Sequence, residues 1–225
     1  MQNKEKIKKI DKNTFIIADT HFGHENINKH EPIRLRKSYE NGFSNPDEFM
    51  IHQWNQKVKP DDTIFHLGDL AFKYPDILEL SNKLNGNKIL LIGNHDKSKD
   101  IQILKDNGWE IIDSIFIDLK TKLSQKIDKI ISKHKDEKLL ACYVCDIDNK
   151  RLMFTHFPLF DDNPYDKHYK NITTILEQIY IALDCNYNIH GHTHSKGAKE
   201  PFCISACVEK VAFEPILLSE LLKES

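Results

Sequence analysis

The chain has 225 residues, of which 40% are hydrophobic and 29% charged, and its 32 basic and 34 acidic residues leave a net charge of −2. This composition excludes an intrinsically disordered chain, and it gives no overall field that would attract nucleic acid or anionic lipid. No apolar run of the sequence approaches the roughly 20 residues that span a bilayer, and no signal sequence follows the lysine-rich N-terminus. We therefore expect a cytoplasmic protein with no membrane partner.

The first half of the chain alternates short apolar runs with helical patterns. β-Branched and aromatic residues predict three strands, at residues 14–18, 63–67 and 88–92. Apolar side chains at helical spacing predict helices at residues 45–58, 74–84 and 101–107. A longer extended run follows at residues 109–119. This alternation is typical of a mixed α/β domain with helices covering the sheet.

The second half begins with lysine-rich residues 120–138, whose apolar side chains recur at helical spacing. They predict an amphipathic helix that is an insertion or a cap over a cleft, and a partner-binding helix is the alternative. Residues 139–146 and 151–155 predict a hairpin. The remaining predicted elements are a helix at 171–183, strands at 186–190, 202–208 and 211–217, and a short helix at 220–223. We predict one domain over residues 1–225, and the sequence does not specify an oligomeric state.

The five cysteines are odd in number, which fits reduced thiols. Cys142 and Cys145 have the C-x-x-C spacing of a redox or zinc half-site. They lie in a strand-like run, however, where residues three apart face opposite sides of a sheet. We expect buried thiols.

Polar clusters follow five of the apolar runs, and they carry the chemistry of the chain. Ligand sites of open α/β sheets lie outside the strand ends, so these clusters are expected to converge. Their donors are carboxylate, imidazole and amide oxygen, a set that suits manganese, iron, zinc, cobalt or nickel. There are too many donors for one tetrahedral ion and enough for two. In chain order the clusters are Asp19-Thr20-His21, Gly68-Asp69, Gly93-Asn94-His95-Asp96, Thr155-His156 and Gly191-His192-Thr193-His194.

Each cluster taken singly has an ordinary structural explanation. Asp19 fits a helix cap or a turn, and the glycine beside Asp69 and Asn94 suits turn chemistry equally well. His156 fits a hydrogen-bonded histidine at a strand end. Five such clusters in order, each behind an apolar run, exceed what chance provides.

In this order the clusters resemble the pattern of the calcineurin-like metallophosphoesterases, which runs D-x-H, G-D, G-N-H-D/E, H and G-H-x-H. They extend from Asp19 to His194, over most of the chain. Residues 19–27 read D-T-H-F-G-H-E-N-I, which is similar to the start of small bacterial and phage members. The resemblance implies a four-layer α/β/β/α sandwich of mixed sheets flanked by helices. It also implies hydrolysis of phosphate esters, with phosphodiesters favoured over monoesters and nucleotides or nucleic acid among the candidate substrates.

Carried over position by position, the resemblance implies two divalent metal ions. Asp19, His21, Asp69 and His194 would hold the first ion. Asp69 would bridge to the second ion, whose set is completed by Asn94, His156 and His192. Manganese is the ion we favour, over iron, zinc, nickel and cobalt. The reaction implied is in-line attack of a metal-bridging hydroxide on phosphorus.

The resemblance gives His95 a different role from the ligands. The matching histidine approaches the scissile phosphate as general acid or charge stabiliser, and the acid after it, here Asp96, orients it. Chemistry from the residues agrees. Two cations produce hydroxide near neutral pH without a protein base, so the missing group is a proton donor for the leaving oxygen, which imidazolium supplies.

Three further residues are candidates for substrate contact. His24 follows His21 by three residues and either leans over the metal site or only opens a helix. Related small members often carry Arg-Pro-Phe after this helix, whereas residues 31–36 here read E-P-I-R-L-R. Arg34 or Arg36 is therefore a candidate for the phosphate-binding arginine, with solvated side chains as the alternative.

Two other functions stay open. One is a non-catalytic protein-binding scaffold on the same fold, and the other is a metal-dependent enzyme with another hydrolytic target. Degenerate scaffold members lose part of the metal and catalytic set, whereas every position is filled here, His95 included.

Overall fold

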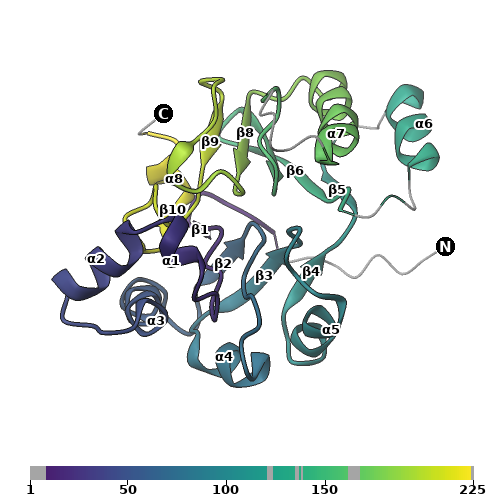
Figure 1. Ribbon diagram of the computed structural model, residues 1–225. Helices are drawn as coiled ribbons and strands as arrows, with labels where there is room; N and C mark the ends of the chain where they lie inside the picture. Colours follow the sequence, from purple (N-terminus) through teal and green to yellow (C-terminus); the bar gives the residue numbers. More distant parts are fainter. Residues whose placement is uncertain (1–8, 121–123, 135–136, 138, 162–167, 224–225) are drawn as a thin grey trace.

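The computed structural model describes residues 9–120, 124–134, 137, 139–161 and 168–223. Two five-stranded sheets lie against each other, and helices cover the outer face of each (Figure 1). The layers therefore run helix, sheet, sheet, helix, which confirms the predicted four-layer α/β/β/α class. In the described part of the chain, no helix combines the length and the apolar character needed to cross a membrane.

The first sheet has the strand order β10-β1-β2-β3-β4. Strands β1 to β4 are parallel, so their carboxyl ends meet at one edge, and β10 is antiparallel to β1. The strands are β1 Phe15–Ile17, β2 Thr63–His66, β3 Asn87–Leu91, β4 Glu110–Ile112 and β10 Ile216–Leu217. The helices on this side are α1 Ile27–His30, α2 Ile33–Glu40, α3 Pro46–Lys57, α4 Ile77–Lys83 and α5 Ser98–Asp106, and α8 Leu218–Leu221 follows β10.

The second sheet has the order β5-β6-β7-β8-β9. Its β6–β7 pair is the predicted antiparallel hairpin, and the other neighbours are parallel. The strands are β5 Ile115–Asp118, β6 Cys142–Ile147, β7 Lys150–Thr155, β8 Tyr187–His190 and β9 Cys203–Ser205. Helices α6 Gln125–Lys133 and α7 Lys170–Ala182 cover its outer face, and the 3-10 turn η2 His194–Lys196 follows β8.

Apolar side chains fill the space between the sheets and the space under α7. Between the sheets, the ring of Phe65 lies 5.3 Å from that of Phe154 and 5.9 Å from that of Tyr143. Cys145 belongs to this inner core, whereas Cys142 belongs to the cluster under α7. Both thiols are buried and free, which confirms the expectation for the C-x-x-C pair.

Four elements differ from the sequence prediction. Residues 109–119 form two strands in different sheets, because the chain crosses from β4 to β5 at this point. The predicted strand 211–217 is reduced to Ile216–Leu217, since Ala212 and Phe213 adopt left-handed backbone conformations that end an extended run. Helix α2 was not predicted. The predicted helix 120–138 is α6 in the described part, and residues 121–123, 135–136 and 138 lie outside it.

The segment after β9 joins the two sheets. The amide of Ala206 donates to the carbonyl of His190 in β8, and its own carbonyl accepts from Ala18, which follows β1. Val208 then donates to the carbonyl of Ala18. The end of β1 is thereby placed beside the end of β8, and the polar clusters of the two sheets face each other.

Candidate metal centre

The structure brings the five predicted clusters together at the strand ends. Asp19, Asp69 and Asn94 follow β1, β2 and β3 of the first sheet, while His156 follows β7 of the second. The turn that bears His192 and His194 follows β8. We call Asp19, His21 and His194 the first group and Asn94, His156 and His192 the second group, and we treat Asp69 separately.

Five of these seven residues have left-handed backbone conformations. The φ angles are 58° at Asp19, 48° at His21, 57° at Asp69, 70° at His192 and 50° at His194. Non-glycine residues seldom adopt this region, and such conformations concentrate at functional sites, where the surrounding structure holds them in place. These turns therefore accept unfavourable backbone conformations in order to direct the side chains toward one another.

Glycines allow the turns to approach each other. A Cβ on Gly191 would lie 2.5 Å from Oδ2 of Asp19, and one on Gly68 would lie 2.6 Å from Nδ1 of His156. The close approach at Gly191 also lets the amide of His192 donate to Oδ2 of Asp19 over 2.7 Å. Glycine is needed here because any side chain would force the two strand ends apart.

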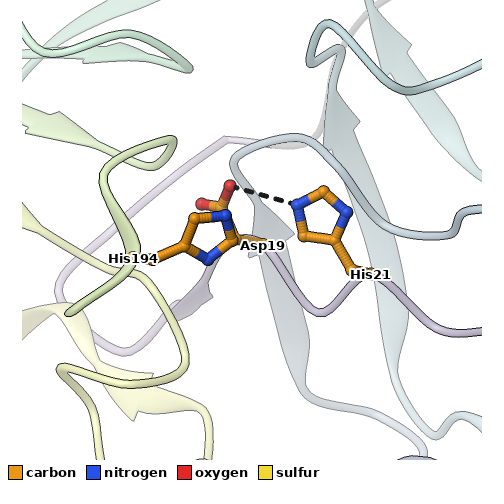
Figure 2. A group of neighbouring side chains, drawn as sticks. All are labelled: Asp19, His21 and His194. Carbon is orange, nitrogen blue, oxygen red and sulfur yellow. Dashed lines mark ion pairs between the residues drawn. The ribbon is translucent and has the colours of Figure 1, made fainter. Parts of the chain in front are cut away.

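In the first group, two imidazoles flank one carboxylate (Figure 2). Nε2 of His21 lies 3.8 Å from Oδ1 of Asp19, and the rings of His21 and His194 have centroids 5.1 Å apart. Among the described residues, Oδ1 of Asp19 and both ring nitrogens of His21 are buried and have no hydrogen-bond partner. Burying such atoms unpaired is costly, and a divalent cation would coordinate Oδ1 of Asp19 and one ring nitrogen of His21. The first group therefore fits a metal ion.

Asp69 lies between the two groups. Its Oδ2 is 3.4 Å from Nε2 of His21 and also 3.4 Å from Nε2 of His156. Its Oδ1 accepts a hydrogen bond of 2.8 Å from the amide of His95. One carboxylate oxygen thus faces an imidazole of each group, which is the place a bridging ligand must occupy.

In the second group, acceptors surround the His156 ring. Nδ1 donates to the carbonyl of Leu67 over 2.9 Å, which leaves Nε2 facing Oδ1 of Asn94 at 2.9 Å and Oδ2 of Asp69 at 3.4 Å. Burial alone would lower the pKa of His156, but the carboxylates of Asp69 and Asp19 raise it to about 10. The raised pKa means that Nε2 of His156 carries a proton. A metal cation can take the place of that proton between Nε2 and the oxygens of Asn94 and Asp69. His192 lies alongside, with its ring 5.2 Å from that of His156.

The same charges act on the carboxylates. Burial alone would raise the pKa of Asp19, but the imidazoles of His21, His156 and His194 hold it below its usual range. Burial is likewise outweighed at Asp69, where His156 and His21 lower the pKa. Both side chains are therefore anionic, as metal-binding carboxylates must be.

His95 is exposed at the mouth of the centre, whereas the carboxylate of Asp96 faces backbone amides. The His95 ring lies 5.4 Å from that of His21. The carboxylate of Asp96 accepts from the amides of Gly93, Asp69 and Leu70 over 2.8 to 2.9 Å. Burial raises its pKa to about 6 despite these hydrogen bonds. Asp96 therefore fixes two ligand-bearing turns to each other, and its predicted role in orienting His95 stays a prediction.

The three candidate substrate residues lie in different environments. His24 is half-buried near the centre, with its ring 5.5 Å from that of His21 and 4.2 Å from that of Phe72, and burial lowers its pKa to about 4. Arg36 is exposed on α2 and pairs with Glu40 at 3.8 Å. Arg34 is only 1% exposed, and its guanidinium donates to protein carbonyls and to Glu209. The predicted substrate contact of Arg34 is therefore corrected.

Glu209 is a site residue that the sequence does not reveal. Its carboxylate pairs with Arg34 and lies 3.3 Å from Nδ1 of His194. It follows Cys207-Val208 with no glycine, histidine or motif beside it. The left-handed turn from Ala212 to Phe213 was equally hidden, so nothing in the local pattern marks this segment as part of the centre.

Comparison with known proteins gives few likenesses, and no family model matches the chain. It is 34% identical over 108 residues to the uncharacterized protein MJ1445 of Methanocaldococcus jannaschii, a match covering 44% of this chain and 55% of that protein. The chain thus spans about half the length of this curated relative. It is also similar to the protein of unknown function AQ665 from Aquifex aeolicus, with 28% identity, a TM-score of 0.66 and coverage of 94% of this chain and 98% of the other. The two chains therefore share one fold over nearly their whole length.

Two further solved structures are more distant. One is a novel archaeal phosphodiesterase, with 19% identity, a TM-score of 0.38 and coverage of 86% of this chain and 81% of the other. The other is a predicted phosphoesterase from Streptococcus pneumoniae, with 11% identity, a TM-score of 0.32 and coverage of 86% and 70%. At these scores neither likeness carries an argument about activity, which is argued below from the residues.

Proposed function

We propose that this chain is a calcineurin-like metallophosphoesterase that uses two divalent metal ions to hydrolyse phosphate esters, diesters in preference to monoesters. The observation that carries the proposal is the position of Asp69, whose Oδ2 lies 3.4 Å from an imidazole of each group. A carboxylate shared by two sets of ligands is the arrangement of a two-metal site. The unpaired buried atoms of Asp19 and His21 support it.

The residues fit two ions in the order predicted from the sequence. Asp19, His21 and His194 with Asp69 would hold one, and Asp69 with Asn94, His156 and His192 would hold the other. When bound, such ions neutralise phosphoryl oxygens and lower the pKa of water, which is the chemistry that ester hydrolysis needs. Manganese is the ion we favour for this set of oxygen and nitrogen donors.

His95 supplies the remaining function. Its side chain is exposed beside the first group and its backbone amide is tied to Asp69, so the ring stands at the mouth of the centre. We assign it to donate a proton, or a hydrogen bond, to the leaving oxygen of the ester. Asp96 holds the turn from Gly93 to His95 in place through the amide of Gly93.

The test is turnover of chromogenic esters by the full chain. Protein stripped with chelator should hydrolyse neither bis(p-nitrophenyl) phosphate nor p-nitrophenyl phosphate, and added manganese should restore turnover, faster for the diester. No turnover with any of manganese, iron, zinc, nickel or cobalt would contradict the proposal and favour the scaffold alternative. Hydrolysis of carboxylic esters in place of phosphate esters would favour a different hydrolase.

A further inference from the structure

Behind the first group, Arg34 and Glu209 form a buried ion pair. Nη2 and Nε of Arg34 lie 2.6 Å and 2.8 Å from Oε1 of Glu209, and each side chain is 1% exposed. Arg34 lies in the first turn of α2 and Glu209 in the turn after Val208, so neither belongs to one of the five clusters predicted from the sequence. A buried pair of this kind is expensive to desolvate, which makes it weak evidence for stability alone.

Each member of the pair holds one turn of the first group. Arg34 donates from Nη1 to the carbonyl of Thr20 over 2.8 Å and from Nη2 to that of Asp19 over 2.7 Å. Oε1 of Glu209 lies 3.3 Å from Nδ1 of His194. The pair therefore ties the Asp19–His21 turn to the His192–His194 turn, although the two are far apart in the sequence.

The contact with His194 has a chemical consequence. An imidazole that donates from Nδ1 to a carboxylate has its tautomer and its ring orientation fixed, and its Nε2 becomes a more basic ligand. A guanidinium offers several donors in one rigid plane, so Arg34 can direct two of its nitrogens at Glu209 and also donate to two carbonyls.

We propose that Glu209, held by Arg34, is a positioning residue that sets the orientation and tautomer of His194 for the first metal ion. This inference rests on the proposed two-metal function. It predicts an effect on one ion and not the other, because His156 in the second group is oriented by the carbonyl of Leu67.

The test is calorimetric titration of manganese into chelator-stripped protein. Glu209→Gln should lower the affinity for the first ion by about 10- to 100-fold, which is the range found for residues that hydrogen-bond to metal ligands. The affinity for the second ion should stay at the wild-type value. The matched control is Glu31→Gln, since Glu31 lies close to His194 but accepts from the hydroxyl of Ser195 over 3.0 Å. Wild-type affinity in Glu209→Gln, or an equal loss in Glu31→Gln, would overturn the proposal.

A second variant guards against misfolding. Arg34→Met with Glu209→Gln removes both buried charges, so no charge is left unpaired in the core. Circular dichroism should show the native fold, while the first ion should again bind more weakly. A protein that binds two ions and hydrolyses no ester would defeat the proposed function and leave this inference standing. Full-strength binding in both variants with normal turnover would defeat this inference alone.

A different set of contacts, around Phe72, concerns the substrate. The Phe72 ring lies 5.5 Å from that of His95, and the ammonium groups of Lys73 and Lys97 lie over it at 5.5 Å and 5.6 Å. Both lysines are exposed, and the structure gives neither an ion pair with a described carboxylate. Lys73 has the left-handed φ of 59°. Two cations that pair with no described carboxylate are thus held beside His95, the proposed donor to the leaving oxygen.

We infer that Lys73 and Lys97 bind a second phosphate of the substrate, adjacent to the one that is cleaved. Two ammonium groups attract a phosphate group because each acts as a positive point charge. They do not impose the bidentate geometry that an arginine would. The inference deepens the proposed function, because it assigns the substrate to phosphodiesters that carry a second phosphate.

The dinucleotide dTpdT and its 5′- and 3′-phosphorylated forms test this, because they share one cleavable diester and differ by one phosphate. The wild-type protein should give a higher kcat/KM for one of the phosphorylated forms, and Lys73→Ala with Lys97→Ala should bring that ratio close to one. Lys59→Ala, which removes an exposed charge before β2, is the matched control and should keep the ratio. An unchanged ratio in the double variant, or no preference in the wild type, would overturn the inference, while turnover of dTpdT itself tests the proposed function separately.

Discussion

The first group of the candidate centre is supported by a charged pair from outside the five clusters, whereas the second is supported from within its own turns, by the carbonyl of Leu67 and the carboxylate of Asp96. His194 lies against the carboxylate of Glu209, which Arg34 pairs in turn. His156 instead donates to the carbonyl of Leu67, and the turn of Asp69 is fixed through amides that donate to Asp96. The two groups are thus vulnerable to different changes: the first to loss of distant charges, and the second to changes in its own ligands and turns.

Replacing Asp69 should have the largest effect, because it is shared by both groups. Asp69→Asn keeps a residue that tolerates the left-handed conformation and removes the charge that faces His21 and His156. We expect turnover to fall by more than about 100-fold, since losing a ligand costs more than losing its outer partner. Atomic absorption should show both ions depleted. Retention of one tightly bound ion would mean that Asp69 belongs to a single group.

Replacing His95 should remove turnover and spare both groups. His95→Asn should lower kcat by about 100- to 10,000-fold, the range of general acid catalysis, because the leaving oxygen loses its donor. Metal content of the variant should stay at two ions, since the His95 ring is not among the grouped ligands. Loss of metal together with activity would show that His95 is a ligand.

Filling the gap at Gly191 should weaken the contact between the sheets at the first group. A Cβ there would lie 2.5 Å from Oδ2 of Asp19 and 2.9 Å from the Cβ of Ala18. We expect Gly191→Ala to lower the free energy of unfolding by about 1–3 kcal/mol, the usual cost of overpacking. Gly42→Ala is the comparison for backbone strain without crowding, because its φ is 83° and nothing lies within 4 Å of a Cβ at that position. A loss of less than about 1 kcal/mol in Gly191→Ala, measured by urea denaturation, would show that close approach at Gly191 is unimportant.

A pH-dependent effect concerns the buried His66, whose Nε2 lies 3.0 Å from the hydroxyl of Thr20, the residue between Asp19 and His21. Burial lowers the pKa of His66 from 6.5 to about 3. Between these values the unfolded chain binds a proton that the folded protein does not, so the stability due to neutral His66 is complete above pH 6.5 and is lost as the pH falls. In chelator, His66→Gln should reduce the slope of unfolding free energy below pH 6.5 by about 1.4 kcal/mol per pH unit. Identical slopes would show that His66 is not buried as a neutral base.

The same contrast explains how much of the centre could be predicted from the sequence. Each ligand cluster lies directly after an apolar run, and strand ends of one sheet converge, so local pattern was sufficient to place Asp19, Asp69 and Asn94 together. Glu209 lies in a turn with no such signal, and its contact with Arg34 depends on the pairing of residues 206–208 with Ala18. A long-range contact of this kind leaves no trace in sequence periodicity.

Arg34 and Asp96 show what the sequence could not predict about residues that it did place near the centre. Arg34 is a residue type that suits phosphate and was a candidate for substrate contact, whereas Asp96 was assigned to orient His95. The structure uses their charges to hold backbone, Arg34 through the carbonyls of Asp19 and Thr20, and Asp96 through three amides. Residue type and position predicted that they lie near the centre, but only the hydrogen bonds show which way each side chain faces.

The central claim is that two metal ions share Asp69, and anomalous diffraction from crystals soaked in manganese tests it most directly. The account predicts two manganese peaks, one contacted by Asp19, His21 and His194 and the other by Asn94, His156 and His192, with Asp69 contacting both. A single peak, or two peaks of which Asp69 contacts only one, would contradict it.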